Sequence, residues 1–201
     1  MKKRTLFLMV FVSVMTLYSC NRVYLALVGA RTPRLETDEG IFKRGKELGI
    51  EADKVLAYKD SAFLKIKRFT SNSIYVFDKA GIYLKIQENS DNPKCEGPIF
   101  KALEGIGPVS YFARDSSKTL AFESSLWQNL QTKSTYTELS SNNHDYTVVY
   151  YWNLFNSLKN NQKDIELIKA NISKNKSVNF HLILVNQDLR SADPTLAGVK
   201  L

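Results

Sequence analysis

The sequence predicts an α/β fold, in which helices pack against a sheet that is at least partly parallel. An apolar run over Val148–Trp152 leads into a polar, amphipathic segment, and a second apolar run follows over Phe180–Val185. Buried strands read as short continuous apolar runs, and the order strand, helix, strand is typical of a right-handed crossover between parallel strands. We therefore expect the chain to be organised around the segment Thr147–Asp188.

The helix of this central unit is predicted from one aliphatic stripe. Residues at helical spacing form the stripe: Leu154, Leu158, Ile165, Ile168 and Ile172. The other positions carry amides and lysines, including Lys159 and Lys163. Such a pattern indicates a helix that packs one face on the sheet and turns a basic, amide-rich face to water.

The first part of the predicted domain, up to Ile66, is expected to contain one helix and two short strands. Thr37 can cap a helix over Asp38–Leu48, which has acidic residues in its first turn and a glycine, Gly49, as its stop signal. Val55–Tyr58 and Phe63–Ile66 are short apolar segments that we expect to be strands.

The clearest strand pattern lies in Ser73–Gln87. Aliphatic residues alternate with other residues on both sides of the turn Asp78–Gly81, namely Ile74, Val76, Ile82, Leu84 and Ile86. A period of two around a turn with glycine in a left-handed conformation is typical of a β-hairpin.

Between the hairpin and the central unit, the pattern favours helices. Pro98 suits the first position of a helix that runs to Leu103. Asp115 or Ser116 can cap a further helix that runs through Leu130. Its expected buried side holds Leu120, Trp127 and Leu130. The polar segment Thr132–Asp145 is expected to be a loop.

The N-terminus has the parts of a bacterial lipoprotein signal peptide. The residues MKKR are cationic, Thr5–Leu17 is apolar but too short to span a bilayer comfortably, and Cys20 follows at once. The sequence LYSC resembles the lipobox, whose cysteine is acylated and becomes the first residue of the mature protein. We therefore expect lipidation at Cys20. The alternatives are an uncleaved signal anchor or an ordinary signal peptide that is cut nearby.

Lipidation would divide the chain into a signal peptide over residues 1–19, a lipidated cysteine and tether over 20–36, and a single α/β domain over 37–201. Several acyl chains hold a protein stably on a membrane. Asn21, rather than Asp, follows the cysteine, which in enterobacterial sorting implies the outer membrane and a domain facing the periplasm. Without the signal peptide the chain has 25 basic and 20 acidic residues, and outside the cytoplasm we expect no nucleic-acid partner.

The join between the central strand and helix resembles the thioredoxin-like superfamily. There the first strand ends in Trp followed by Cys-x-x-Cys, and the second ends in an Asn-x-Asp-like corner. Here Trp152 is followed by Asn153-Leu154-Phe155-Asn156, so asparagines replace both redox cysteines. Only thirteen residues follow Asp188, so we do not expect the helix, cis-proline loop, hairpin and terminal helix that are usual at that point of the fold. The hairpin at Ser73–Gln87 is the candidate source of antiparallel strands.

The two asparagines remove the redox chemistry that the resemblance would imply. In active relatives the motif sits at a helix N-terminus, whose dipole lowers the pKa of the first thiol. Asparagine cannot form a thiolate, but it is a strong N-cap. We therefore expect Asn153 to cap the central helix, Asn156 to be a surface amide, and Trp152 to be a core aromatic rather than a substrate platform.

Cys95 is the candidate reactive thiol. With Cys20 lipidated, it is the only cysteine left, so the mature chain cannot form an intramolecular disulfide. Lys94 would favour its thiolate and Glu96 would oppose it. A free cysteine also serves as a small buried hydrophobic residue.

The two histidines of the chain, His144 and His181, do not form a recognisable site. His144-Asp145 has no nucleophile elbow to complete a triad, and adjacent residues on a strand point to opposite faces. His181 flanks an apolar run and is expected in the core or at a sheet edge. We expect no metal and no cofactor.

Together these features predict a membrane-anchored envelope lipoprotein without enzymatic activity, acting as a binding or structural module for another envelope protein. One alternative is a thiol-dependent redox enzyme that uses Cys95. Another is a carrier of an acyl chain or small ligand, based on the apolar segment Val23–Ala30.

Overall fold

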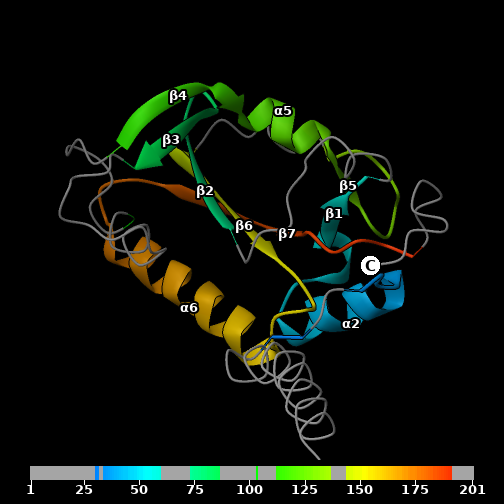
Figure 1. Cartoon of the computed structure of the whole chain (residues 1–201). Coiled ribbons are helices and arrows are strands. Elements are labelled where there is room, and N and C mark those ends of the chain that lie inside the picture. The colour runs from blue at the N-terminus through cyan, green and yellow to red at the C-terminus, as the bar shows by residue number, and fades with distance from the viewer. Residues whose placement is uncertain are drawn as a thin grey trace, which may run out of the picture.

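A computed structural model describes residues 30–31, 34–59, 73–86, 103, 112–136 and 144–191. Within these ranges the helices are α2 (Asp38–Glu47), the 3₁₀ helix η1 (Ala52–Lys54), α5 (Leu120–Ser125) and α6 (Leu158–Lys174). The strands are β1 (Leu56–Tyr58), β2 (Ser73–Asp78), β3 (Ile82–Ile86), β4 (Phe112–Thr119), β5 (Trp127–Asn129), β6 (Tyr146–Trp152) and β7 (Phe180–Asn186) (Figure 1).

All the named strands join one mixed sheet, in the order β4-β3-β2-β6-β7-β1-β5. At its centre β6 and β7 pair in parallel, from Tyr146 opposite Phe180 to Trp152 opposite Asn186. β1 continues the parallel part beyond β7, whereas β2 pairs antiparallel with β6. α2 and α6 cover one face of the sheet and α5 lies on the other (Figure 1). The predicted α/β class is therefore confirmed, as a seven-stranded mixed sheet with helices on both faces.

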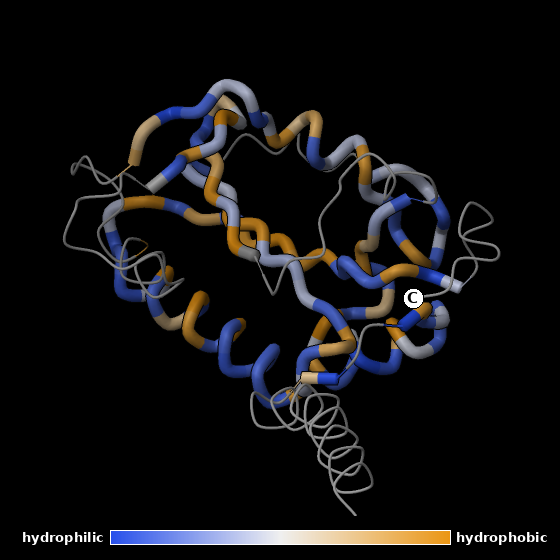
Figure 2. The backbone as a smooth tube through the Cα atoms, viewed as in Figure 1, coloured by the Kyte–Doolittle hydropathy of each residue, from blue (hydrophilic) through white to orange (hydrophobic). Residues whose placement is uncertain are grey.

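The central strand β6 supplies side chains to two hydrophobic cores, one on each face of the sheet. Val148, Tyr150 and Trp152 belong to the core beneath α2 and α6, whereas Val149 and Tyr151 belong to the core on the α5 side. Burial on both faces explains why this strand reads as a continuous apolar run. Figure 2 shows the same result as an orange centre of the sheet.

The aliphatic stripe predicted for the central helix is confirmed for the four residues within α6, whereas Leu154 is buried in the same core but precedes the helix. Ile165 and Ile168 are buried against the sheet, and Leu158 and Ile172 pack at the margin of the same core. The opposite side of the helix is hydrophilic, as the blue stretches of α6 in Figure 2 show. Burial of one face, rather than intrinsic propensity, supplies most of the stability of such a helix.

Aromatic rings dominate the core on the α5 side. The ring of Tyr151 stacks on Tyr58 at 5.6 Å between centroids and meets Tyr75 and Trp127 edge-on. Its hydroxyl donates a hydrogen bond of 3.0 Å to the buried carboxylate of Glu123. Burial, and then the neighbouring Tyr58 and Glu123, raise the pKa of Tyr151 well above its usual value.

The first predicted helix and the hairpin are also confirmed. The side chain of Thr37 accepts a hydrogen bond from the backbone N–H of Gly40, and α2 ends at Glu47, one residue earlier than predicted. Gly49 and Gly81 both have a φ of +74°, the left-handed conformation that each turn requires. β2 and β3 pair antiparallel around that second turn.

The helix predicted from Asp115 or Ser116 through Leu130 is wrong. Residues 112–119 form β4, which pairs antiparallel with β3, and the cap of the short helix α5 is Thr119, whose side chain accepts a hydrogen bond from the N–H of Phe122. The chain then enters β5. The three residues predicted as the buried side of one helix are all buried, but they lie in α5, in β5 and in the turn after β5: Leu120, Trp127 and Leu130.

Several predictions fall outside the described residues. These are the signal peptide with Cys20, the strand Phe63–Ile66 and the thiol Cys95. Of the helix predicted over Pro98–Leu103, only Leu103 is described, and it is helical and buried.

Candidate functional site

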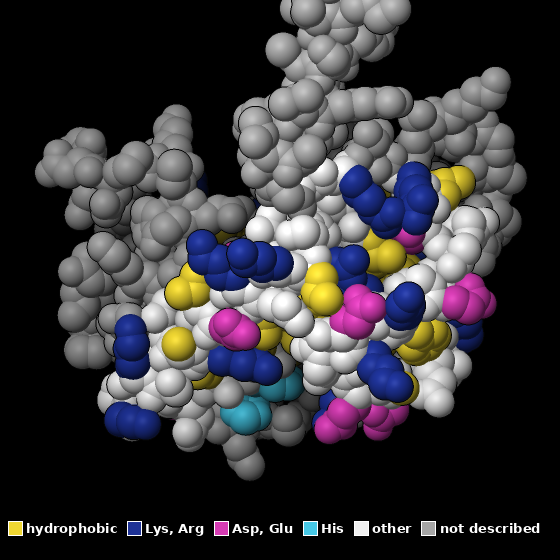
Figure 3. All heavy atoms as spheres, turned by 90° about the horizontal axis from the view of Figure 1, so that it is seen from below, with side chains coloured by type: hydrophobic (Ala, Val, Ile, Leu, Met, Phe, Trp, Pro, Cys, Tyr) yellow, Lys and Arg dark blue, Asp and Glu magenta, His cyan; other side chains and the backbone are white. Residues whose placement is uncertain are grey.

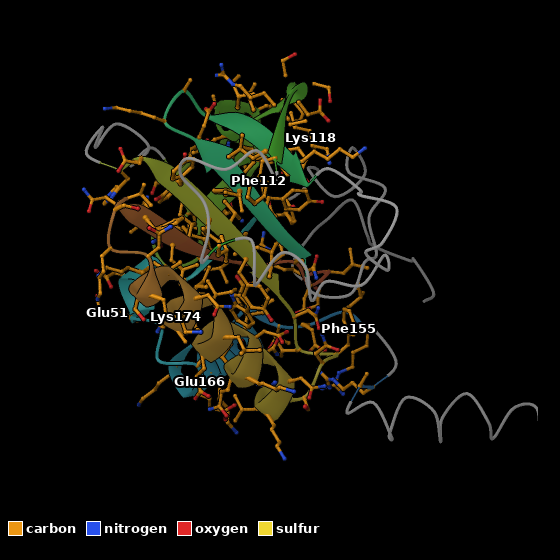
Figure 4. The ribbon with its side chains drawn as sticks, turned by 90° about the vertical axis from the view of Figure 1, so that its left-hand side faces the viewer. Glu51, Phe112, Lys118, Phe155, Glu166 and Lys174 are labelled. Carbon is orange, nitrogen blue, oxygen red and sulfur yellow. The ribbon has the colours of Figure 1, made fainter. Side chains whose placement is uncertain are left out.

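A cleft of about 650 Å³ lies at the end of the sheet where β6 stops and α6 begins. Three segments line it: the chain before α2, one side of α2, and the loop between β6 and α6. We call it the β6–α6 cleft, and its lining includes Arg31, Arg34, Lys43, Arg44, Leu154 and Phe155. In Figure 4, Phe155 is labelled near the first turn of α6, and Lys174 marks the other end of this helix.

The loop that forms one wall of the cleft is fixed by buried amides. The side-chain oxygen of Asn153 accepts a hydrogen bond of 2.9 Å from the backbone N–H of Asn156. The backbone carbonyl of Asn153 accepts one of 2.8 Å from the side chain of Asn161, in the first turn of α6. Asn153 and Asn161 are both fully buried. These bonds hold the loop in one conformation, because breaking them would leave buried polar groups without partners.

This geometry corrects the prediction that Asn153 caps the central helix. α6 begins at Leu158, and its N-cap is Ser157, whose side chain accepts a hydrogen bond from the N–H of Asn160. Asn153 closes a tight turn four residues earlier instead. A short polar side chain can accept a hydrogen bond either at a helix N-terminus or within a turn, and the side chain of Asn153 does so within the turn. Neither Asn153 nor Asn156 is therefore the N-cap of α6.

A second fixed point is the corner after β7. One carboxylate oxygen of Asp188 accepts hydrogen bonds from the backbone N–H of Leu154 (2.8 Å) and from the side chain of Asn186 (2.7 Å). Burial raises the pKa of Asp188 to about 7, with a further increase from Glu36. These two hydrogen bonds and Arg31 act in the opposite direction. The Asn-x-Asp corner thus ties the end of β7 to the wall of the cleft.

Trp152 is fully buried in the core beneath α2 and α6. Among the described residues, no acceptor lies within hydrogen-bond distance of its indole nitrogen. A side chain without exposed surface cannot serve as a platform for a substrate in this conformation. The structure places Trp152 in the core, as the sequence favoured, and leaves the adjacent loop residues to form the cleft.

The segment before α2 is folded against this loop. Ala30 forms an antiparallel bridge with Asn156, and the N–H of Arg31 donates to the carbonyl of Phe155 at 2.7 Å. Further on, Glu36 forms a parallel bridge with Arg190. Long-range pairing thus places residues 30, 31 and 36, which belong to the predicted tether, against the α/β domain.

Glu36 is the buried anion that organises two of the cationic side chains of the cleft. Arg31 and Arg34 both form ion pairs with the same carboxylate oxygen of Glu36. The Nε of Arg31 also donates a hydrogen bond of 3.0 Å to the carbonyl of Leu154. A buried carboxylate needs such partners, because an unpaired charge in the interior is strongly unfavourable.

α2 adds two more cations to the cleft. Arg44 donates from Nη1 to the carbonyl of Asn156 at 3.2 Å and pairs through Nε with Glu47 at 3.2 Å. Lys43 is exposed, and it forms no ion pair with a described residue. Dark-blue Lys and Arg side chains are prominent on the face of the molecule that α2 and α6 form (Figure 3). The cleft thus carries four cationic residues and two carboxylates.

The two histidines come together at the opposite end of the central strands. The rings of His144 and His181 stack with centroids 5.0 Å apart. The carboxylate of Asp145 accepts a hydrogen bond from the backbone N–H of Asn179. That bond fixes the carboxylate at the strand end, where it supports β7 rather than a catalytic triad. Within the described residues, no group of three or more His, Cys, Asp or Glu side chains is arranged to hold a metal ion.

The sequence located one wall of the cleft and missed the other. The resemblance pointed to the loop through Trp152, Asn153 and Asn156, and its Asn-x-Asp corner pointed to Asp188. Nothing in the local pattern marked Arg31 as part of the same site, since it lies more than a hundred residues away in the chain.

No protein-family model matches this chain, and neither the curated proteins nor the solved structures include one with detectable similarity to it. None of the helices in the described part of the chain is both long enough and apolar enough to cross a membrane.

Proposed function

We propose that this chain is a bacterial envelope lipoprotein, and that its α/β domain is a non-catalytic binding module that contacts another envelope component. The anchor is an acylated Cys20 in the outer membrane, with the domain facing the periplasm. The observation that carries the non-catalytic part is the state of Asn153 and Asn156. Both residues take part in a fixed turn, and the four residues Asn153–Asn156 include no thiol or hydroxyl group.

We also propose that the domain is thioredoxin-like in its central unit. The parallel pair β6–β7, joined by α6, has the antiparallel strand β2 beside β6 and β3 beyond it. In thioredoxin-like proteins an antiparallel hairpin follows the central unit in the chain. Here the hairpin β2–β3 precedes that unit in the chain, which departs from the usual order. Its position in the sheet, beside β6, is what supports the proposal.

Membrane anchoring is tested by comparing wild type with Cys20→Ala in bacterial cell fractions. We expect wild type in the membrane fraction and the variant to lose the acyl chains, with a changed gel mobility and release into the soluble periplasmic fraction. Metabolic labelling with a fatty-acid analogue provides a second measurement. Equal membrane partitioning and equal labelling of the two proteins would show that Cys20 is not the anchor.

The non-catalytic assignment is tested in an insulin-reduction assay on the purified full chain. We expect the rate to equal that of buffer with reductant alone. The alternative, a redox enzyme that uses Cys95, predicts activity that is lost in Cys95→Ser. Activity that persists in that variant would contradict both hypotheses, since Cys20 would be the only thiol left.

A further inference from the structure

The cationic side chains of the β6–α6 cleft are oriented by contacts that leave part of each one available. Arg34 uses Nε for Glu36, and Arg44 uses Nη1 and Nε for Asn156 and Glu47. Among the described residues, no acceptor engages the terminal nitrogens of Arg34, Nη2 of Arg44 or Nζ of Lys43. A guanidinium held along one edge offers its remaining donors in a fixed direction.

We propose that the β6–α6 cleft binds a phosphate group, through Arg34, Lys43 and Arg44. The inference rests on the proposed function as a binding module and names the chemistry of the ligand. Four cationic residues face two carboxylates in the cleft, and each of those carboxylates already lies against an arginine. The side chains that line the cleft therefore have a net positive charge. Arginine can donate two parallel hydrogen bonds to the oxygens of a phosphate.

The first turn of α6 adds to the positive electrostatic potential of the cleft. Ser157, the N-cap of this 17-residue helix, lines the cleft, so the positive end of the helix dipole faces the same space. The helix end alone would not define a site. The arginine side chains beside it, held by Glu36, Glu47 and the carbonyl of Asn156, supply the specific donors.

The cleft also has an apolar side, and the chain length sets an upper limit on its distance from Cys20. Leu35, Leu154 and Phe155 line it next to the cations, which suits a phosphate ester better than the bare ion. Ala30, which also lines the cleft, follows Cys20 by ten residues. Such a segment spans at most about 35 Å. The headgroups of the membrane that would hold Cys20 are therefore one source of the phosphate, and a soluble phosphate ester is the other.

Calorimetric titration of the full chain, purified in a nonionic detergent, tests the proposal. The probes are inorganic phosphate, glycerol 3-phosphate and dihexanoyl phosphatidylglycerol, with dihexanoylglycerol as the phosphate-free control. The cleft variant is Arg34→Gln with Lys43→Gln. The matched control is Lys159→Gln with Lys163→Gln, which removes the same charge from exposed positions on α6 that do not line the cleft. Lys43→Gln alone serves as a second variant that disturbs no ion pair with a described residue.

We expect at least one phosphate probe to bind, and the cleft variant to lose about tenfold or more in affinity, a loss that raised salt should reproduce. The control should stay within about twofold of wild type, since exposed charges contribute little at a distance. Binding of only the lipid probe identifies the headgroup as the source, and binding of the two soluble probes identifies the phosphate itself. No binding by any phosphate probe, or equal losses in the cleft and control variants, would overturn the proposal. The result does not depend on Cys20, so a failed anchor and a failed cleft are told apart.

Discussion

Asp188→Asn should make the protein more stable at pH 8 and have little effect near pH 4. Burial raises the pKa of Asp188 from an ordinary value of 3.8 to about 7, and the charge of Glu36 adds to this effect. Between pH 3.8 and about 7, Asp188 is therefore protonated in the folded state and ionised in the unfolded state, so the folded state binds up to one more proton. Stability from this group is fully present at low pH and is lost as the pH rises through about 7. Asparagine resembles the protonated carboxyl and keeps an oxygen to accept from Leu154 and Asn186.

The size of the effect follows from the same pKa. Each tenfold change in proton affinity corresponds to about 1.4 kcal/mol, so the ionised carboxylate costs at most about 4 kcal/mol in the folded state. Relaxation of the surroundings and partial solvation reduce this figure, and we expect a gain of roughly 1–3 kcal/mol for Asp188→Asn at pH 8. Urea unfolding curves at several pH values between about 4 and 8 give the difference in free energy of unfolding.

Two further variants sharpen this test. Asp145→Asn serves as the control, because the carboxylate of Asp145 also accepts a hydrogen bond from a backbone N–H, at the opposite end of the central strands. Glu36→Gln should lower the pKa of Asp188 and move its effect to lower pH, because the Glu36 charge is one of the causes of the raised pKa. A difference between Asp188→Asn and wild type that is equal at pH 4 and pH 8 would refute the reasoning. So would a gain at pH 8 no larger than that of the Asp145 control.

Two other predictions concern α6 and the loop before it. Ile168→Ala should lower the free energy of unfolding by about 2–5 kcal/mol, since Ile168 is fully buried, whereas the exposed Lys163→Gln on the same helix should cost less than about 1 kcal/mol. Equal losses in urea unfolding would contradict the one-sided burial of α6. Asn153→Cys with Asn156→Cys should show no insulin-reductase activity and should lose about 1–3 kcal/mol, because a buried turn loses its acceptor and neither residue caps a helix. Activity above that of wild type would show that the loop can present a thiolate after all.

The central strand, helix and strand were predictable because their burial is set by local pattern. β6 is buried on both faces and so reads as apolar throughout, and α6 has one buried stripe. β4 is different, since half-exposed and exposed positions run along FARDSSKT and no alternation marks it. Its strand state follows from pairing with β3, a contact between residues far apart in the chain, and this tertiary interaction overrides the local helix-cap signal at Asp115.

The candidate site also has one part that the sequence predicted and one part that it did not. The loop after Trp152 was marked by its resemblance, but the helix cap was misplaced, because both Asn153 and Ser157 are good cap residues and only the fold selects between them. The cationic wall comes from Arg31, Arg34 and two residues of α2. It contacts the loop through the bridge between Ala30 and Asn156 and through the hydrogen bond from Arg44 to the carbonyl of Asn156. Long-range bridges of this kind leave no periodic trace in the sequence.

The fixed turn and the cationic wall have one physical consequence together. In a thioredoxin-like site with its cysteines, the loop after the first strand must present a reactive side chain at the start of the helix. Here the side chain of Asn153 is turned inward to its own backbone, and the loop offers carbonyl groups outward instead. The carbonyls of Leu154 and Asn156 accept from Arg31 and Arg44, so the loop now positions guanidinium donors. With guanidinium donors and no thiol beside the loop, this end of the sheet is suited to the proposed recognition of an anion.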